Sequence, residues 1–224
     1  MTTGPPLGPI MDMRTSCIEN LLRERQTRPV GIVHLGILGN PYRVLISTIL
    51  SLKTKDNVME EASGRIFAIA PDLESLDCRS EEEILKAIYP VGFYRTKART
   101  IKQLAKNVRE QRGGKIPERL EELLTLPGVG LKTANLVISA GFGGEALCVD
   151  THVHRIVNRW GLVRTKNPDD SFRAIDPHIP GSLKPRINPA FVAFGQSVCL
   201  PVSPRCSLCP FDGSCAKLLV RHSR

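Results

Sequence analysis

Four cysteines near the C-terminus form the densest group of potential metal ligands in the sequence. They follow the spacing C-x6-C-x2-C-x5-C and are Cys199, Cys206, Cys209 and Cys215. Several prolines and a glycine lie between them, so we expect a loop rather than a helix. Four thiolates on one loop can hold an iron–sulfur cluster or a zinc ion. Zinc sites more often use two short cysteine pairs, so the spacing slightly favours iron and leaves zinc open.

A second candidate is a glycine-rich turn followed by a lysine, in the segment LPGVGLKTA over residues 126–134. Gly128 and Gly130 allow backbone conformations that other residues avoid, and they let the N–H groups around Val129 approach a ligand. A helix expected over 129–140 would direct its positive end at this turn, which favours an anion. A helix–hairpin–helix element binds a DNA phosphate in this way without reading base sequence. On the turn alone, an ordinary connection between helices is the better interpretation.

Lys132 and Asp150 are the residues with the most reactive potential. Lys132 is expected in the first turn of a helix, where the helix dipole favours a neutral, nucleophilic amine over an ammonium. A phosphate-binding surface lysine is the alternative, and the position alone favours it. Asp150 precedes a helix predicted over 151–160, and an N-cap role is enough to explain it. His152 and His154 are two residues apart, so they face different sides of that helix and predict no metal pair.

The elements that must position these residues are helices almost throughout. We expect them over 14–25, 42–52, 57–69, 95–112, 117–126, 129–140 and 151–160, with one more opened by Ser80. No alternating apolar–polar run is long enough for a confident strand, so the predicted fold class is all-α. In the 95–112 helix the basic residues share one face, namely Arg95, Arg99, Lys102, Lys106 and Arg109. That face is interpreted equally well as a phosphate-binding surface or as a solvated one.

Composition limits the class of protein. The chain has 224 residues and a formal net charge of +9, which suits a polyanionic partner such as nucleic acid. No apolar run approaches about 18 residues, and the Gly- and Pro-rich start does not resemble a secretory signal. We therefore expect an intracellular protein with no membrane partner and with reduced cysteines. The scattered Cys17, Cys78 and Cys148 are interpreted as small buried hydrophobes.

Taken together and in this order, several motifs resemble the endonuclease III family of the helix–hairpin–helix superfamily. They are LPGVGLKTAN at 126–135, VDTHVHR at Val149–Arg155, FGQSVC at 194–199, the four-cysteine loop, ILSLKTKD at Ile49–Asp56 and VGFYRTKA at Val91–Ala98. The resemblance covers roughly residues 30–216, and three motifs in the right order make a chance match improbable.

The resemblance implies two helical lobes after a flexible tail over 1–13. A six-helix barrel with the helix–hairpin–helix would occupy 34–144. A domain holding a [4Fe–4S] cluster on the four cysteines would combine 14–33 with 145–224. The partner implied is double-stranded DNA with damaged bases or abasic sites. We expect a monomer, associated with DNA in the cytoplasm or nucleoid of a prokaryote.

The same resemblance implies a bifunctional DNA glycosylase and AP lyase of base excision repair. Lys132 matches the family's nucleophile, which would form a Schiff base with an oxidised pyrimidine nucleotide and nick the strand by β-elimination. Asp150 matches the essential carboxylate. Two alternatives stay open: a monofunctional mismatch or uracil glycosylase, against which Lys132 argues, and a non-enzymatic, metal-bound DNA-binding module.

DNA contacts are implied for the turn at Gly128, Val129 and Gly130, for Arg99, and for two gap-filling positions. Phe93 matches an apolar wedge, although a core phenylalanine explains it equally well. Lys53 departs from the family pattern, which has glutamine there. Lysine offers only donors and a charge, so it would favour guanine as the partner base or bind a phosphate instead. A solvated lysine is the remaining interpretation.

Overall fold

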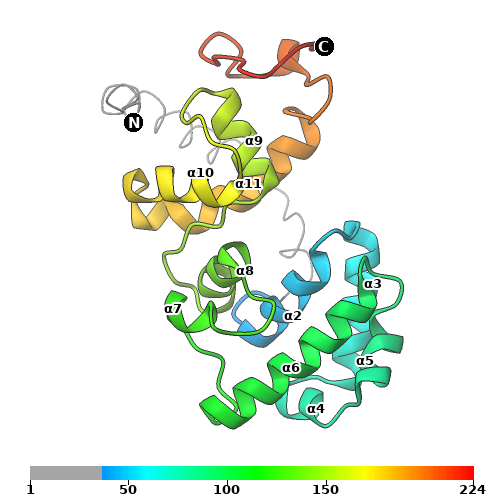
Figure 1. Ribbon diagram of the computed structural model, residues 1–224. Coiled ribbons are helices and arrows are strands. Elements are labelled where there is room, and N and C mark those ends of the chain that lie inside the picture. The colour runs from blue at the N-terminus through cyan, green and yellow to red at the C-terminus, as the bar shows by residue number, and fades with distance from the viewer. Residues whose placement is uncertain (1–36) are drawn as a thin grey trace. The chain divides into compact units, whose positions relative to one another are not determined.

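The computed structural model describes residues 37–224, and all regular structure in this range is helical, which confirms the predicted fold class (Figure 1). The α-helices are α2 (Pro41–Ser51), α3 (Asp56–Ile69), α4 (Leu73–Asp77), α5 (Glu81–Ile88), α6 (Tyr94–Arg112), α7 (Leu120–Leu123), α8 (Leu131–Leu136), α9 (Thr151–Arg159), α10 (Pro168–Ile175) and α11 (Lys184–Ser197). A π-helical segment, η2 (Val137–Gly141), extends α8. Short 3-10 turns are η3 (Asp176–His178), η4 (Gly181–Leu183) and η5 (Cys206–Leu208). The tail expected over 1–13, the helix expected over 14–25 and Cys17 lie outside the described residues.

Local capping explains where several of these helices begin. Asn40 accepts a hydrogen bond from the Arg43 N–H at 3.0 Å and opens α2 one residue before the predicted start. Ser80 opens α5, as the sequence predicts, and it forms a reciprocal capping box with Glu83. The helix predicted over 95–112 is observed as α6 with nearly the same bounds. These boundaries follow from side chains that bind their own backbone within one turn.

Two predicted helices are shorter or less regular than expected. The helix predicted over 117–126 is only α7, and the chain closes it with i→i+3 bonds that end at Leu126, directly before Pro127. The helix predicted over 129–140 starts at Leu131 and widens into η2. The Ala140 carbonyl accepts from the Gly39 N–H at 2.9 Å, so it bonds outside the helix. A side chain on Gly141 would come within 2.7 Å of the Pro41 Cα, so the packing of η2 on α2 requires glycine there.

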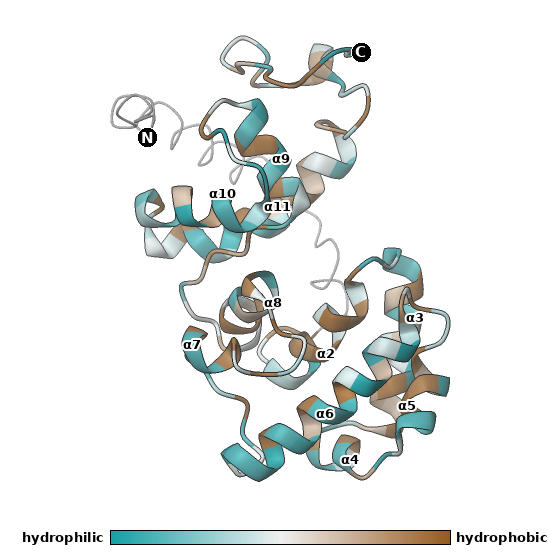
Figure 2. Cartoon of the chain, viewed as in Figure 1, coloured by the Kyte–Doolittle hydropathy of each residue, from teal (hydrophilic) through white to brown (hydrophobic). Residues whose placement is uncertain are grey.

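The described residues divide into two compact units, with the boundary between Ala146 and Leu147. In the first unit α2 is the central helix and contacts α3, α6, α8 and η2. Its buried residues are Tyr42, Val44, Leu45, Ile46, Ser47, Thr48, Ile49 and Leu50. In Figure 2, hydrophobic and hydrophilic residues alternate along α6, whose buried stripe includes Ala98, Ile101, Ala105 and Val108 as predicted. The domain limits of 34–144 and 145–224 remain a prediction, as does the assignment of 14–33.

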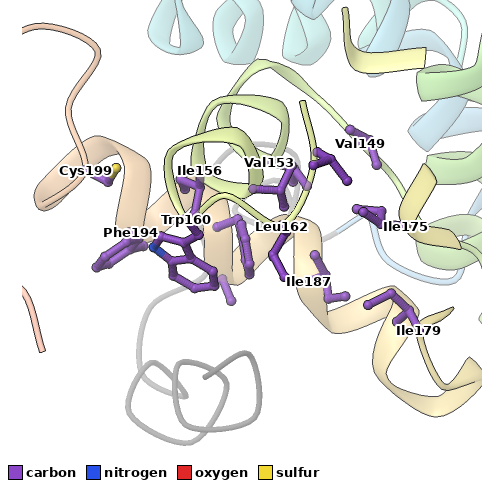
Figure 3. Packing of buried hydrophobic residues seen from close by; sticks show 14 of the residues in the cluster. Val149, Val153, Ile156, Trp160, Leu162, Ile175, Ile179, Ile187, Phe194 and Cys199 are labelled. Carbon is purple, nitrogen blue, oxygen red and sulfur yellow. The ribbon is translucent and has the colours of Figure 1, made fainter. Parts of the chain in front are cut away.

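The second unit is built around α9 and α11. The stripe predicted on α9 is buried: Val153, Ile156, Val157 and Trp160 are each at most 4% exposed. The Trp160 ring packs edge-on against Phe191 and Phe211, with ring centroids 5.4 and 5.2 Å apart. Figure 3 shows Phe194 beside Trp160, and Cys199 beyond the end of α11. An aromatic core therefore lies directly under the start of the four-cysteine loop. No helix within residues 37–224 is both long and apolar enough to cross a membrane.

Candidate active site and DNA interface

The glycine-rich turn has an open face and a closed face. Gly128 adopts a positive φ of 74°, and a Cβ there would lie 2.4 Å from the Thr100 Cγ2 atom of α6. A Cβ on Gly130 would meet nothing within 4 Å. Val129 buries its side chain and donates its N–H to the Leu126 carbonyl at 3.2 Å. The open face therefore belongs to Gly130, where another molecule can approach the backbone.

Lys132 is the second residue of α8, directly after this turn, and it is half-buried. Gly130 is the N-cap of α8 and provides no capping side chain, and the first turn of the helix contains no acidic residue. Lys132 therefore stands in the first turn of a helix, as the sequence predicts.

Asp150 is the N-cap of α9 and is only 9% exposed. One carboxylate oxygen, Oδ1, accepts both cap bonds, from the His152 N–H at 2.8 Å and from the Val153 N–H at 3.0 Å. The predicted N-cap is therefore confirmed. Asp150 lies in the second unit and Lys132 in the first. His154 has a structural contact, because its Nδ1 lies 2.7 Å from the hydroxyl of the buried Ser171.

Lys53 and Phe93 lie on loops and share an unusual backbone conformation. Lys53 follows α2 with φ 53°, and Phe93 precedes α6 with φ 57°. Phe93 is 70% exposed, so the interpretation of Phe93 as a core residue is wrong. Its left-handed backbone turns the ring away from the buried stripe of α6. A large exposed aromatic side chain on a fixed loop suits an intermolecular contact.

Lys97, which no sequence motif singled out, connects α6 to the segment around Lys53 through its side chain. Lys97 is 6% exposed and donates from Nζ to the carbonyls of Leu50 and Leu52, at 2.8 and 2.5 Å, and to the Thr54 hydroxyl at 3.0 Å. Burial lowers the pKa of Lys97 to about 8. The contacts suit both protonation states, because a neutral amine can accept a hydrogen bond from the Thr54 hydroxyl while donating to both carbonyls.

The basic face of α6 is paired with acidic residues, which differs from the uniform, self-repelling surface expected from the sequence. Asp77 of α4 binds Arg109, with Nε 2.8 Å from Oδ2, and also contacts Lys102. Arg99 lies 3.8 Å from a Glu81 carboxylate oxygen of α5, and its side chain stays 68% exposed. These ion pairs hold α6 against α4 and α5, so part of the basic face has a structural role. Contact of Arg99 with DNA remains a prediction.

The four C-terminal cysteines line one cavity in the second unit, together with Arg159, Trp160 and Phe194. Arg159 is 6% exposed and places its Nη1 atom 3.4 Å from the Cys199 sulfur, and the Lys217 N–H donates to the Cys215 sulfur at 3.3 Å. Burial raises the pKa of Cys209 to about 11. Within residues 37–224 no three Cys, His, Asp or Glu side chains are grouped so that they could hold a metal ion.

The two other cysteines among the described residues differ in burial. Cys148 is buried, as expected for a small hydrophobe, but Cys78 is exposed, so the prediction for Cys78 is wrong. Cys78 is the C-cap of the short helix α4, where the chain turns toward Ser80 at the surface. The nearby apolar residues Leu73 and Leu76 are the buried residues of α4 itself. Cys78 follows the last residue of that helix, so the burial of these leucines does not extend to it.

A family model described as "HhH-GPD superfamily base excision DNA repair protein" matches residues 46–177. Endonuclease III of Thermotoga maritima is 43% identical over 176 residues, which cover 79% of this chain and 83% of that protein. The chain belongs to the endonuclease III family. Endonuclease III-like protein 1 of Bos taurus is 41% identical over 75% of this chain, which spans only 56% of that relative's length.

A solved structure of a trapped endonuclease III–DNA covalent intermediate with an estranged adenine is similar in fold, with a TM-score of 0.84 and 29% identity. It covers 97% of both chains. These similarities establish the chain as a base excision repair DNA glycosylase/lyase. Relatives in the endonuclease III family usually carry a [4Fe–4S] cluster.

Proposed function

We propose that the enzyme removes oxidised pyrimidines and nicks the strand through a Schiff base on Lys132. The observation that carries this proposal is the place of Lys132 at the start of α8, directly after the open Gly130 turn. A damaged base is unreachable in the stack, so the nucleotide is extruded from the duplex. The neutral Lys132 amine then attacks the sugar C1′, and the bond from C1′ to the base breaks. The base leaves with the electron pair and takes up a proton.

After the base has left, the Lys132 nitrogen loses a proton, the C1′–O4′ bond breaks as the C=N bond forms, and O4′ takes up a proton. The resulting Schiff base permits the second step. Loss of a proton from C2′ sends electrons toward the iminium, and the C3′–O bond breaks with the 3′ phosphate as leaving group. In this proposal Asp150 stabilises the positive charge that develops on the sugar as the base departs, and it assists the deprotonation of Lys132. Both cap bonds use Oδ1, and a carboxylate accepts at both of its oxygens, so capping and catalysis are compatible.

DNA binding in this proposal uses three parts of the first unit. The Gly128–Gly130 turn binds one phosphate through its backbone on the open side of Gly130, whereas the Val129 N–H is already used within the turn. Lys53 and Phe93 enter the space left by the extruded nucleotide, with Lys53 toward the orphaned base. Arg99 remains exposed enough to reach a phosphate beside its contact with Glu81.

We also propose that Cys199, Cys206, Cys209 and Cys215 hold a [4Fe–4S] cluster. Two observations fit this group: four thiols line one cavity, and N–H donors reach two of the sulfurs. The spacing C-x6-C-x2-C-x5-C contains only one short cysteine pair, which favours the cluster over zinc. When bound, the cluster supplies structural cross-linking of the loop, which has little apolar core of its own.

The test of the nucleophile is borohydride trapping on an oligonucleotide with one oxidised pyrimidine. Wild-type protein should give a covalent adduct, and Lys132→Gln should abolish the adduct while binding to the damaged duplex stays within about threefold. Lys115→Gln, an exposed lysine beyond α6, is the matched control and should trap normally. An adduct retained by Lys132→Gln would assign the nucleophile to another amine. Base release without any trapped adduct in wild type would favour the monofunctional glycosylase.

A further inference from the structure

The loops that carry Lys53 and Phe93 are in direct contact, and the contact is polar and specific. The Gly92 N–H donates to the Thr54 hydroxyl at 3.1 Å. A Cβ on Gly92 would lie 2.2 Å from the Lys53 carbonyl oxygen, so the two backbones approach more closely than any side chain allows. The Thr54 hydroxyl lies within hydrogen-bonding distance of Gly92, Lys97 and Leu52 and therefore connects the two loops with the end of α2.

The buried amine of Lys97 secures this junction from below. Its contacts with the Leu50 and Leu52 carbonyls occupy acceptors at the C-terminal end of α2, which lack partners within the helix. Its contact with Thr54 extends the same network to the loop of Gly92. An apolar residue at this position would leave those two carbonyls without the Lys97 donor and would remove the link to Thr54.

The network holds Lys53 and Phe93 in place, and both residues have a left-handed backbone conformation. Positive φ is unfavourable for non-glycine residues, and it persists only where the surroundings impose the conformation. Lys53 and Phe93 both adopt it, at φ 53° and 57°, on the two sides of the Thr54–Gly92 contact. Both side chains are exposed, so no packing of the side chains themselves fixes these conformations.

We propose that Lys97, acting through Thr54, is a positioning residue that fixes the Lys53 and Phe93 loops as one rigid wedge for the duplex gap. This inference rests on the proposed function, in which those two side chains enter the gap. Loops that are already rigid lose little conformational entropy when DNA binds. The entropy of ordering them is lost during folding and does not weaken the complex. Lys97 does not itself contact DNA in this proposal.

The experiment uses full-length protein and a duplex in which a stable abasic-site analogue faces 2-aminopurine. The fluorescence of 2-aminopurine reports how the orphaned base is stacked in the complex. Thr54→Val removes the connecting hydroxyl, and Thr54→Ser retains it. Phe93→Ala removes one side chain of the wedge. Tyr42→Phe is a stability control in the same unit, because it loses the buried bond from the Tyr42 hydroxyl to the Ala70 carbonyl, 2.7 Å, away from both loops.

We expect Thr54→Val to weaken binding about five- to tenfold, which is the range for loss of one stacking contact, and to give the fluorescence of the Phe93→Ala complex. Thr54→Ser and Tyr42→Phe should behave like wild type. Combining Thr54→Val with Phe93→Ala should add little to Phe93→Ala alone, because both remove the same wedge. Lys97→Met should reproduce Thr54→Val, and if that variant does not fold, the comparison of Val with Ser at position 54 decides.

The positioning role of Lys97 and Thr54 would be overturned if Thr54→Val kept wild-type fluorescence and affinity while Phe93→Ala altered the signal. That result would still support the wedge. An unchanged signal in both Phe93→Ala and Lys53→Gln would overturn the wedge itself and with it the role of Lys97. Failure of the proposed chemistry is read separately, from the borohydride adduct of the wild-type protein.

Discussion

Alanine substitutions at Gly128 and Gly130, in the turn before α8, should have opposite consequences. At Gly128 the backbone has φ 74°, which costs an L-residue about 1–2 kcal/mol. The new methyl group would also lie 2.4 Å from Thr100 Cγ2, far inside a normal carbon–carbon contact, and such overpacking costs about 1–3 kcal/mol. Gly128→Ala should therefore lose about 2–5 kcal/mol of stability.

At Gly130 the same substitution meets no atom within 4 Å, and its φ of −105° is allowed for alanine. We expect the stability of Gly130→Ala to stay within about 1 kcal/mol of wild type. Its affinity for DNA should fall about tenfold or more, because a methyl group then stands where the phosphate approaches the backbone N–H groups, and a hydrogen bond to a charged group is worth about 1.5–3 kcal/mol.

The assays are thermal unfolding and binding to an abasic-site duplex at fixed salt. For a chain of this size about 1 kcal/mol moves the melting temperature by about 2–4 °C, so Gly128→Ala should melt at least about 4 °C below wild type. Thr100→Ser provides a matched background, since it removes Cγ2 and should reduce the cost of Gly128→Ala to the backbone contribution alone. An undiminished cost in that background would refute the steric argument. Unchanged DNA affinity in Gly130→Ala would refute the assignment of the open face to the phosphate.

Three further predictions concern the remaining site residues. Asp150→Asn keeps an N-cap, so its stability should fall by less than about 1 kcal/mol, whereas single-turnover excision should slow on the order of 100-fold; near-normal excision would reduce Asp150 to a cap. Cys206→Ser should lower iron below the about four atoms per chain expected of wild type, and one zinc with no iron in anaerobically prepared wild type would exclude the cluster. Wild type should excise a lesion opposite guanine at least about fivefold faster than opposite adenine, and Lys53→Gln should abolish that preference; a parallel loss of both rates would indicate phosphate contact instead.

The sequence predicts best those features that are decided within one helical turn. Ser80 and Glu83 cap α5 through each other, and Asp150 caps α9 through the N–H groups of His152 and Val153, so four residues contain each interaction. The buried stripe of α9 follows equally from a 3.6-residue period. The family resemblance adds the order of the motifs, and the matches to the family confirm the fold class and the activity that it implies.

Interactions between distant segments are not encoded in that local pattern. The basic face of α6 is visible from its spacing, but its partners Asp77 and Glu81 belong to α4 and α5, and only packing brings them together. The π-helical segment after α8 has the same origin, since the Ala140 carbonyl bonds to Gly39, some one hundred residues earlier in the chain. Local helix propensity therefore predicts a solvated basic face for α6 and a regular α-helix after Leu136, because it includes no contact with other helices.

The start of α6 shows how such a nonlocal feature can still leave a signal in the sequence. Extending the buried register of α6 from Val108 through Leu104 and Ile101 toward the N-terminus leads to position 97 and then to position 93. Periodicity thus predicts that Phe93 is buried, and it gives no reason for a lysine at 97. In the structure position 97 is buried as the register requires, but Phe93 is exposed, because the helix begins at Tyr94 and Phe93 adopts a positive φ. A charged residue at a buried position requires hydrogen-bond acceptors, and a large apolar side chain exposed just before a helix is stabilised when another surface buries it. For Lys97 the acceptors are the carbonyls at the end of α2 and the Thr54 hydroxyl. For Phe93, in the proposed wedge, the burying surface is the bases of the duplex.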